Sequence, residues 1–473
     1  MNLPGTLIES LQNLKGFDEA AFREVHQSGG QIVSIRLNPG KVNTPPSATL
    51  RTKVEAEDAV PWNSNGYYLR ERPSFTLDPL FHAGAYYVQE ASSMFLEEAL
   101  KQTVDLSGPL KLLDLCAAPG GKSTLIQSII SKESLLISNE VIKSRVNILA
   151  ENITKWGAAT VVVTNNDPSD FKRLQNYFDV IVVDAPCSGS GLFRKDPNAI
   201  SEWSENNVQL CAQRQQRILA DIMGSLKDGG VLIYSTCSYS EPEDEAIADW
   251  LVKQFAMKSL QLTVEENWGI VETVSEKESA FGYRFYPDKV RGEGFFIAAF
   301  KKGSAEIEIN EFKIHPSATL RTKIKSKKKK TESISAKEIE ILRPYLVEPD
   351  DLFFIKQNEE VIALPLHLEE DLAVIQSALY IKKAGVKLGT IIRNELIPAH
   401  DLALSNIMSN NIPAVDVDRE TALQYLRKVD IKIETAITGW VLLTYEQLPI
   451  GWIKAMPNRT NNYYPREWRI LHK

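Results

Sequence analysis

Two cysteine residues each follow an apolar segment of this chain. Thiols at such positions could do covalent chemistry on a bound substrate. The segment FDVIVVDAPCSGSG, at 178–191, carries Asp184 and Cys187 at its end, and VLIYSTCSY, at 231–239, carries Cys237. Such β-branched runs, bounded by turn residues, are typical of parallel strands covered on both faces. Ligands of open α/β sheets bind beyond the carboxyl ends of the strands. We therefore expect Asp184, Cys187 and Cys237 to face a substrate.

The alternative role for any cysteine is that of a small buried hydrophobic residue. For Cys211 we favour that role, because it shares a helical stripe with Val208 and Ile218 in the stretch 205–223. Cys187 and Cys237 instead have small and mostly polar neighbours, namely Pro186, Ser188, Thr236 and Ser238. These neighbours favour a reactive role for the two thiols.

A glycine-containing turn, LDLCAAPGGKST at 113–124, indicates a ligand site. Asp114 ends an apolar segment, and Gly120 and Gly121 open a helix whose backbone amides attract polar groups. The dinucleotide fingerprint GxGxxG is absent, and Cys116 stands where a phosphate-binding loop needs glycine. The turn therefore favours a nucleoside ligand without a phosphate chain, over a nucleotide hydrolase or a purely structural turn.

Two acidic residues extend this site. Glu140, at the end of the second predicted strand, is placed to accept hydrogen bonds from ribose hydroxyls, and Asp167, past the third, to bond an adenine amine. The alternative for either is an ordinary surface carboxylate. S-adenosylmethionine meets these requirements. Besides Glu140, Asp167 and Asp184, we expect the turn itself to hold it through Cys116, Ala117, Ala118, Pro119, Gly120, Gly121 and Lys122, with Cys116 mainly packing.

Strands and helices alternate through the middle of the chain. The predicted strands are Lys111–Leu115, Leu135–Ser138, Thr160–Thr164, Asp179–Asp184 and Val231–Ser235. Alternation of this kind implies βαβ units and a doubly wound, mostly parallel sheet. A last apolar strand, Gly294–Phe300, is expected to lie antiparallel at an edge.

The 473 residues are too many for one core, so several domains are expected. We predict a small N-terminal module at 1–75, a catalytic α/β domain at 76–302, a basic linker at 303–336 and a C-terminal α+β region at 337–473. The lysine run KIKSKKKK, 323–330, is either a solvated linker or a phosphate contact. The octapeptide PSATLRTK occurs at both 46–53 and 316–323, and nothing in the sequence explains it.

Composition excludes some classes of protein. The four cysteines form no CxxC pair and the six histidines do not cluster with them, so no metal site is expected. No apolar run reaches the ~18 residues of a membrane span, and the amino terminus lacks a signal peptide. We therefore expect a cytoplasmic protein. A net charge of −7 argues against general nucleic-acid affinity but permits local basic patches.

The C-terminal tail is one such patch. It combines aromatic and basic side chains suited to base stacking and phosphate contact, namely Trp452, Tyr463, Tyr464 and Trp468 with Arg459, Arg466 and Arg469. For Trp440 and Trp452, on apolar strands, we prefer a core position. The tail therefore predicts an RNA-binding end.

Three motifs in order, AAPGGKST, DAPCSGSG and STCSYSEPEDE, resemble the signatures of the Nol/Nop/Sun family of RNA cytosine-5 methyltransferases. RFYPDKVRGEGFFIA, 284–298, resembles a further family motif. The tail GWIKAMPNRTNNYYPREWR, 451–469, is similar to the RNA-binding, PUA-like end of the bacterial small-subunit ribosomal RNA subgroup. The resemblance implies a methyltransferase α/β fold, S-adenosylmethionine as cofactor and ribosomal RNA, or the small ribosomal subunit, as partner.

The resemblance also implies residue roles. Cys237 would be the nucleophile that attacks cytosine C6, and Cys187 would assist release of the methylated base. Asp184 would hydrogen-bond the cytosine edge, and Lys122 or a helix start would stabilise the Cys237 thiolate. The chain departs from the family's Glu-Asn-Glu with Glu243-Asp244-Glu245, which puts a contact at the helix entry in doubt.

Two rival functions remain open. A transfer-RNA methyltransferase would use the same chemistry, so only the accessory domains distinguish it. A non-catalytic RNA-binding assembly factor would retain the fold, but such a protein has no need of Cys187 or Cys237.

Overall fold

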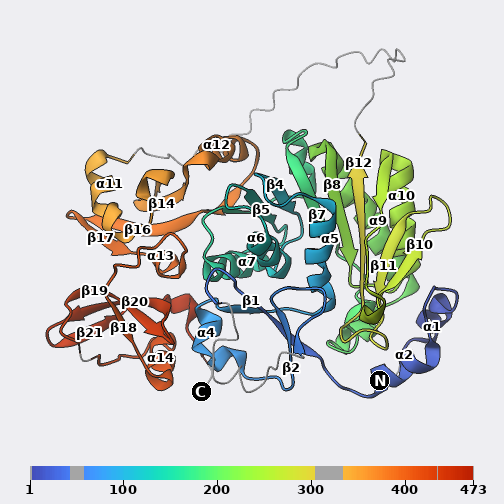
Figure 1. The fold of residues 1–473 in the computed structure, drawn as a ribbon, viewed down its shortest axis with the longest axis horizontal. Coiled ribbons are helices and arrows are strands. Elements are labelled where there is room, and N and C mark those ends of the chain that lie inside the picture. Colours follow the sequence, from blue (N-terminus) through green and yellow to red (C-terminus); the bar gives the residue numbers. More distant parts are fainter. Residues whose placement is uncertain (1–2, 43–57, 304–333, 434, 472–473) are drawn as a thin grey trace, which may run out of the picture.

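The computed structural model describes residues 3–42, 58–303, 334–433 and 435–471 (Figure 1). Both copies of PSATLRTK, the lysine run at 323–330 and most of the predicted linker lie outside the described residues. Within the described part, no helix is both long and apolar enough to span a membrane.

A ten-stranded sheet runs through the centre of the molecule, in the order β10-β11-β12-β8-β7-β4-β5-β6-β15, with β9 pairing β12 (Figure 1). Its parallel part consists of β4 (Lys111–Asp114), β5 (Leu135–Asn139), β6 (Val161–Thr164), β7 (Phe178–Asp184) and β8 (Leu226–Thr236). The chain proceeds outward from β4 to β6 and then returns to β7 on the other side of β4. The order therefore reverses between β4 and β7, where doubly wound folds bind their ligands. The predicted fold class is confirmed.

The last strand of the sheet differs from its prediction in one respect. β12 (Phe295–Lys302) is antiparallel to β8, as predicted, but it is not an edge strand. β11 (Phe281–Phe285) pairs with its first half, β9 (Met257–Leu260) pairs with its second half, and β10 (Val271–Val274) follows β11. Gly282 and Arg284 interrupt the apolar pattern of β11, which hides this strand in the sequence.

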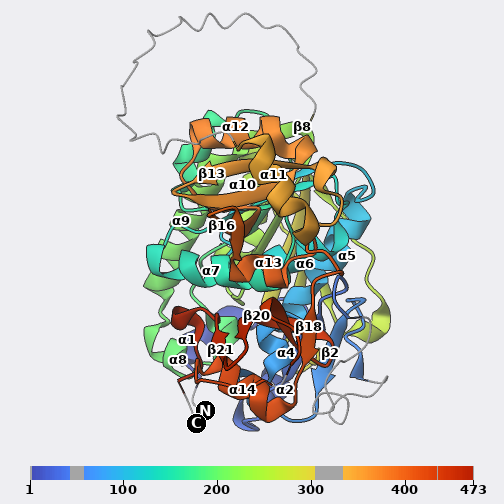
Figure 2. The same cartoon turned by 90° about the vertical axis from the view of Figure 1, so that its left-hand side faces the viewer.

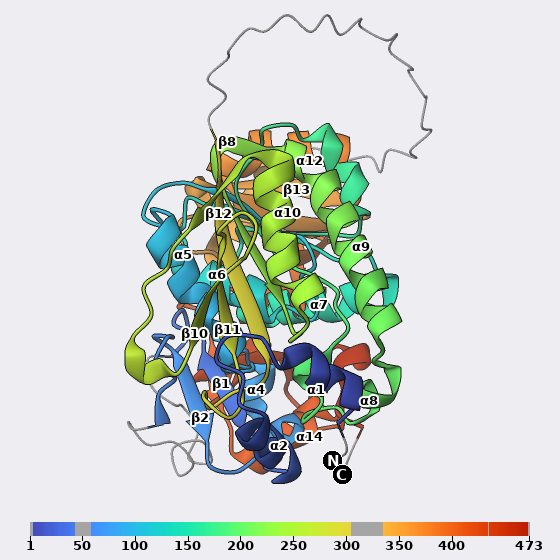
Figure 3. The ribbon, with the colours of Figure 1, turned by 90° about the vertical axis from the view of Figure 1, so that its right-hand side faces the viewer.

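Helices cover both faces of the sheet. α9 (Glu205–Ile222) and α10 (Glu245–Phe255) lie on one face, and α5 (Leu96–Thr103) and α6 (Gly121–Ile129) on the other (Figure 3). In β7, Ile181 and Val183 join one hydrophobic core while Val180 and Val182 join the other, and all four are fully buried. This alternation explains why the strand reads as a continuous β-branched run.

The N-terminal part forms a separate three-stranded sheet in the order β2-β1-β3. Its elements are α1 (Gly5–Leu11), α2 (Glu19–Gln27), β1 (Val33–Leu37), β2 (Gly66–Leu69), α4 (Pro79–His82) and β3 (Tyr86–Val88). The predicted boundary at residue 75 runs through this sheet, because β3 pairs with β1. Buried Arg36 donates hydrogen bonds to Gln89, to the Gly121 carbonyl and to Thr124, so β1 is fastened to the first turns of α6.

The C-terminal part contains two four-stranded sheets, one above the other in Figure 2. The first comprises β13 (Leu352–Gln357), β14 (Glu360–Pro365), β16 (Val386–Ile392) and β17 (Glu395–Pro398), with α11 (Ala336–Leu342), α12 (Glu369–Ala378) and α13 (His400–Leu404). The second comprises β18 (Ala414–Asp416), β19 (Gly439–Tyr445), β20 (Leu448–Met456) and β21 (Arg459–Asn462), with α14 (Arg419–Leu426).

One strand of the C-terminal part belongs to the central sheet. β15 (Ile381–Ala384) pairs antiparallel with β6 and so fastens the region after residue 334 to the catalytic domain. Lys382 and Lys383 leave β15 without an apolar pattern, so this pairing could not be predicted from the sequence. The division into domains remains a prediction. Two strand pairings, β3 with β1 and β15 with β6, join parts that it assigns to different domains.

Candidate active site

Two loops at the carboxyl ends of β7 and β8 bring the two predicted thiols together. The Sγ atoms of Cys187 and Cys237 lie 2.9 Å apart, and both cysteines are free thiols. The Gly191 amide donates to the Cys237 carbonyl at 2.8 Å, and the Gly294 amide donates to the Gly191 carbonyl at 3.0 Å. A Cβ on Gly191 would lie 2.5 Å from the Gly294 carbonyl oxygen. Gly191 thus allows the two loops to meet.

The Cys187 thiol is shifted towards its protonated form. The hydrogen bond to Cys237 and then burial raise the pKa of Cys187 well above its usual value. A protonated Cys187 can donate to the Cys237 sulfur. The shift at Cys187 is consistent with the predicted assignment of Cys237 as the nucleophile, which remains a prediction.

A buried carboxylate holds the two thiol loops together. Glu243 is fully buried and accepts hydrogen bonds from the Ser188 amide at 2.8 Å, the Ser188 hydroxyl at 2.5 Å and the Ser238 hydroxyl at 2.7 Å. Gln215 of α9 donates to the same carboxylate at 3.2 Å. Because Ser188 follows Cys187 and Ser238 follows Cys237, one side chain fixes both loops. From the sequence we expected only a helix-entry contact at this position. The acidic segment EPEDE, directly after STCSYS, was the signal that could have indicated a carboxylate near Cys237.

The residues beside Glu243 continue this support towards β11. Asp244 accepts from the Thr236 hydroxyl at 2.6 Å and lies 3.2 Å from Arg284, which also forms an ion pair with Glu245. Burial raises the pKa of Asp244 well above its usual value. Asp244 stands where the family has asparagine. At this helix entry it forms a hydrogen bond with Thr236.

An ion pair joins the thiol loops to the glycine turn. Lys122 Nζ lies 2.8 Å from Asp184 Oδ2, and the Ser235 hydroxyl donates to Asp184 Oδ1 at 2.9 Å. Burial alone would lower the pKa of Lys122, but Asp184 and Asp114 more than offset it, so the pKa is raised. The Asp184 side chain is 35% exposed and therefore accessible to a ligand. From the sequence we expected Lys122 or a helix start to stabilise the Cys237 thiolate. In the structure, the ion pair of Lys122 is with Asp184.

The glycine turn lies at the topological switch point, above β4. Asp114 is fully buried; its Oδ2 accepts from Ser123 at 2.6 Å, whereas its Oδ1 has no hydrogen-bond partner within the described part of the chain. Burial raises the pKa of Asp114 to about 7. Burial, reinforced by Asp114 and Asp184, also raises the pKa of Cys116. Cys116 packs against the core as a protonated thiol, in keeping with its predicted packing role.

The backbone of this turn is fixed from outside. The Ala117 amide donates to the Asn139 carbonyl at 2.8 Å, Arg145 donates to the Ala118 carbonyl and Asn152 to the Pro119 carbonyl. Gly120 has φ +120°, a conformation that side chains disfavour. Gly120 is buried and Gly121 half-buried, and a Cβ on either would lie 3.4 Å from neighbouring side chains, so the start of α6 is closely packed.

The two predicted acidic residues follow β5 and β6. Glu140 is buried; its Oε1 accepts from the Ile142 amide at 2.8 Å, and its Oε2 lies 3.4 Å from Arg145. Asp167 accepts from the amide and hydroxyl of Ser169, and these bonds lower its pKa. Asp114, Glu140 and Asp167 thus stand at the ends of three adjacent strands. This row fits the polar groups of S-adenosylmethionine, although Asp167 is already engaged as a cap.

The C-terminal aromatic residues divide between core and surface. Trp440 and Trp452 are buried, which confirms the core position preferred for them. Tyr464 is 1% exposed, so its predicted stacking role is wrong: it packs among Tyr425 and His400. Of the other predicted contact residues of the tail, Tyr463, Arg459, Arg466 and Arg469 are exposed and Trp468 is half-buried.

Comparison with known proteins matches each part of the chain. Residues 102–301 match the family model described as 16S rRNA methyltransferase RsmB/F. Residues 3–91 match the N-terminal domain of 16S rRNA methyltransferase RsmF, and residues 412–470 match the methyltransferase RsmF PUA domain. Ribosomal RNA small subunit methyltransferase F of Aeromonas salmonicida is 32% identical over 449 residues, covering 92% of this chain and 90% of that protein. The chain belongs to the RsmB/F methyltransferase family.

Further relatives agree with this membership. The protein of the same name from Aliivibrio fischeri is 30% identical over 423 residues, covering 87% of this chain and 85% of that protein. A methyltransferase homologue from Pyrococcus horikoshii superposes with a TM-score of 0.50 and 25% identity, over 63% of this chain and all of that one. NSun6 from Pyrococcus horikoshii, solved with SFG, has a TM-score of 0.52 and 20% identity, over 64% and 98% of the two chains, and shows the shared fold.

Membership in the RsmB/F family confirms several predictions. The motif-based resemblance is confirmed, and so are S-adenosylmethionine as cofactor and RNA as partner. The roles of the individual site residues and the division into domains remain predictions.

Proposed function

We propose that this protein transfers a methyl group from S-adenosylmethionine to C5 of a cytosine in small-subunit ribosomal RNA, through a covalent bond between Cys237 and C6. The observation that carries this proposal is the 2.9 Å contact of the Cys187 and Cys237 thiols, above β7 and β8 and next to the Asp184–Lys122 pair. The small-subunit substrate is supported by the names of the relatives and the matched PUA domain.

The chemistry explains why a thiolate is needed. Cytosine C5 is a weak nucleophile because the ring is aromatic. Attack of the Cys237 thiolate forms the S–C6 bond, breaks the C5–C6 double bond and makes C5 an enamine-like carbon. Bound S-adenosylmethionine supplies an electrophilic methyl group on its sulfonium. Asp184 accepts a hydrogen bond from the cytosine amino group, and the Lys122 cation offsets the negative charge that the attack adds to the ring.

The thiol pair also explains how the methylated base leaves. Once the Cys237 sulfur is a neutral thioether, its hydrogen bond and charge no longer raise the pKa of Cys187, and only burial and Glu243 still do so, which makes the Cys187 thiol easier to deprotonate. Cys187 then releases its proton to solvent and, as a thiolate, takes the C5 proton. The electron pair of the broken C5–H bond reforms the C5–C6 double bond, and the S–C6 bond breaks. Cys237 leaves as a thiolate, and the pair returns to its starting state.

The RNA must present its target outside a helix. A paired cytosine is stacked, which hides the faces of C5 and C6, so the enzyme needs an unpaired or flipped base. The exposed Arg459, Arg466 and Arg469 of the PUA region supply sites for phosphates. A ribosomal RNA substrate also supports the expected cytoplasmic location.

Mass spectrometry of nucleosides tests the proposal. The purified protein is incubated with S-adenosylmethionine and with small ribosomal subunits, small-subunit RNA or transfer RNA from cells that lack the gene. We expect 5-methylcytidine in the small-subunit arms, and bisulfite sequencing then locates it. A different methylated nucleoside would overturn the C5 assignment. A product formed only in transfer RNA would overturn the substrate.

A further inference from the structure

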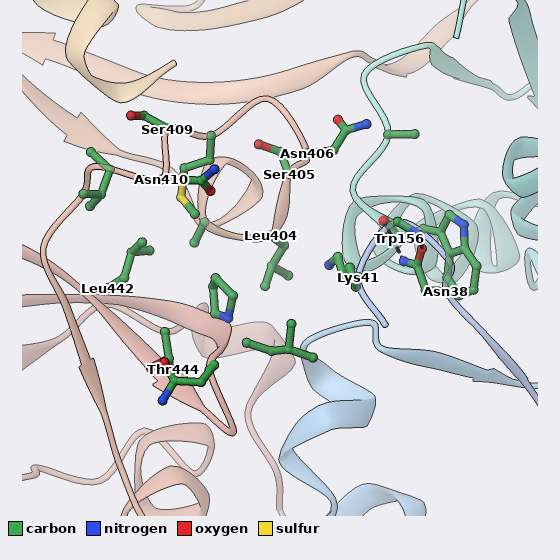
Figure 4. A pocket seen from close by; sticks show the side chains of 18 of the residues that line it. Asn38, Lys41, Trp156, Leu404, Ser405, Asn406, Ser409, Asn410, Leu442 and Thr444 are labelled. Atoms are coloured by element: carbon green, nitrogen blue, oxygen red, sulfur yellow. Dashed lines mark hydrogen bonds between the residues drawn. The ribbon is translucent and has the colours of Figure 1, made fainter. Parts of the chain in front are cut away.

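A cavity lies at the junction of four parts of the molecule, away from the two thiols. Its volume is about 530 Å³. The N-terminal sheet contributes Asn38 and Lys41, the catalytic domain contributes Trp156, and the two C-terminal sheets contribute the segments around 403–414 and 442–449. Figure 4 shows Asn38, Lys41 and Trp156 on one side of this hollow, with Asn410, Leu442 and Thr444 on the other. We call it the junction cavity.

The junction cavity is distinct from the cofactor turn. Its nearest residues on α6 are Gln127 and Ser128, in the last turn of the helix that Gly120 and Gly121 open. Gln127 is seven positions after Gly120, which corresponds to about 10 Å along the helix at 1.5 Å per residue. Neither thiol and none of the predicted cofactor residues lines the cavity.

The chemistry of the lining matches nucleic-acid bases. Five lining side chains are amides, which both donate and accept hydrogen bonds. Asn38 is already bonded to the backbone of Gly84, Trp156 and Gly40, so four remain for a ligand: Gln127, Asn406, Asn410 and Gln447. Amides form paired hydrogen bonds with base edges. Leu404, Leu442 and Trp156 also line the cavity, but each is at most 5% exposed, so they contribute narrow apolar edges rather than a stacking surface. The cavity can therefore hold a base chiefly by its edge.

Charge around the cavity also suits RNA. Among the described residues that line it, none is acidic, and the single basic side chain is Lys41, whose pKa is lowered to about 7 by burial. Asp416 lies next to the lining. It accepts hydrogen bonds from the Thr444 hydroxyl at 2.7 Å and from the Gln447 backbone N–H at 3.0 Å. Lys41 donates to the carbonyls of Ala83 and Lys155, which leaves one of its three N–H groups for a ligand.

We propose that the junction cavity binds an unpaired nucleoside of the ribosomal RNA substrate, at a distance from the target cytosine. The proposal rests on the proposed function, because it assumes an RNA substrate. The volume lies within the ~300–1,000 Å³ typical of small-ligand sites, enough for one nucleoside. Strands β19 and β20 of the PUA-matched region meet the catalytic domain here. A base bound in the cavity would thus fix how the RNA lies across the two regions.

Two exposed amides allow a test that leaves the core intact. In the double variant Asn406→Asp/Asn410→Asp, carboxylates of the same shape would repel the RNA and lose their donors. We expect the KM for small subunits to rise at least tenfold with kcat nearly unchanged. The matched control, Asn358→Asp/Asn394→Asp, adds the same charge at two exposed turns of the first C-terminal sheet. The neutral variant Asn406→Leu/Asn410→Leu should raise KM at least threefold.

Cross-linking gives an independent readout. Small-subunit RNA containing 4-thiouridine is irradiated with the wild-type protein, and the linked peptides are sequenced. We expect a cross-link within 404–412 or 442–449. A KM for the Asp pair equal to that of its control, or cross-links confined to other peptides, would overturn the cavity proposal. Failure of the proposed function looks different, because the wild-type protein would then form no 5-methylcytidine.

Discussion

Two buried carboxylates, Glu243 in the thiol site and Asp114 under the glycine turn, are held in opposite ways. Both are fully buried. Both oxygens of Glu243 accept hydrogen bonds, and the donors come from the two thiol loops and from α9. Asp114 has Ser123 as its donor on one oxygen, and its other oxygen has no partner in the described part of the chain.

This difference indicates how each half of the active site is completed. The thiol loops are held in contact by the protein's own side chains, so the Cys187–Cys237 pair exists before RNA arrives. The glycine turn retains a buried carboxylate oxygen without a partner in the described part of the chain, which a ligand can complete. Preorganisation is therefore concentrated where the covalent bond forms, and adaptability where the methyl donor binds.

The largest effect should come from removing the nucleophile. In Cys237→Ala no S–C6 bond can form, and we expect methyl transfer to fall by about 10³-fold or more. Cofactor affinity should stay within about twofold, because the thiol lies outside the glycine turn. Radiolabel transfer and calorimetry measure the two quantities.

The control for this variant is Cys211→Ala, which removes a buried thiol on α9 outside the thiol loops. It should keep activity within a few-fold of wild type. Activity of Cys237→Ala close to that of this control would remove Cys237 from the mechanism.

Removing the second thiol should separate attack from release. In Cys187→Ala the adduct still forms, but no nearby thiolate takes the C5 proton, so we expect turnover to fall by about 10²-fold. A protein–RNA complex that survives denaturing electrophoresis should accumulate when RNA and S-adenosylmethionine are both present. The double variant with Cys237→Ala should form none. A Cys187→Ala protein that turns over without accumulating adduct would contradict the release role.

The comparison also explains what the sequence could and could not reveal. Cys187, Cys237, Asp184 and the glycine turn follow apolar strands directly, so strand periodicity places them at one edge of the sheet. The role of Glu243 depends on contacts with Ser188, 55 residues away, and no local pattern encodes such a contact.

The same limit applies to the fold. β7 is readable because alternate residues enter two hydrophobic cores. β11 carries Arg284, whose charge is neutralised by Glu245 in another element, and β15 carries two lysines and pairs with β6 across more than 200 residues of sequence. Elements stabilised by distant partners lack the local signal on which sequence analysis depends.

A test of the glycine turn uses pH. Asp114 has a pKa of about 7 in the folded protein and 3.8 when unfolded, so the unfolded state releases its proton first as pH rises. Between these two pKa values the free energy of unfolding falls as pH rises, and above pH 7 this loss is complete. Asp114→Asn removes the loss. The free energy of unfolding of the variant, relative to wild type, should therefore increase by about 2 kcal/mol from pH 5 to pH 7.5.

Urea denaturation at both pH values measures this gain. The control is Asp430→Asn at an exposed position, for which the difference between the two pH values should be near zero. A pH-independent gain for Asp114→Asn would mean that this carboxyl ionises normally in the folded protein. The glycine turn would then be as well satisfied as the thiol site, and the contrast between the two carboxylates would disappear.

The smallest expected effect tests the thiol site through Glu243. In Glu243→Gln one acceptor oxygen becomes an NH₂ group, so a donor from the Ser188 or Ser238 loop loses its partner, which costs about 1–2 kcal/mol. We expect kcat to fall roughly tenfold, because the loops no longer hold the Cys187–Cys237 contact. The KM for S-adenosylmethionine should be unchanged, because Glu243 does not touch the glycine turn. The control Glu241→Gln alters an exposed carboxylate two residues away.

A positioning role predicts more than lost stability. Covalent adduct formation should slow in Glu243→Gln/Cys187→Ala relative to Cys187→Ala alone, at a temperature where both remain folded by circular dichroism. A variant that only unfolds more easily would form the adduct at the parental rate below its melting temperature. That result would reduce Glu243 to a core residue, and the preorganisation of the thiol site would then reside in the backbone contact of Gly191 with Cys237.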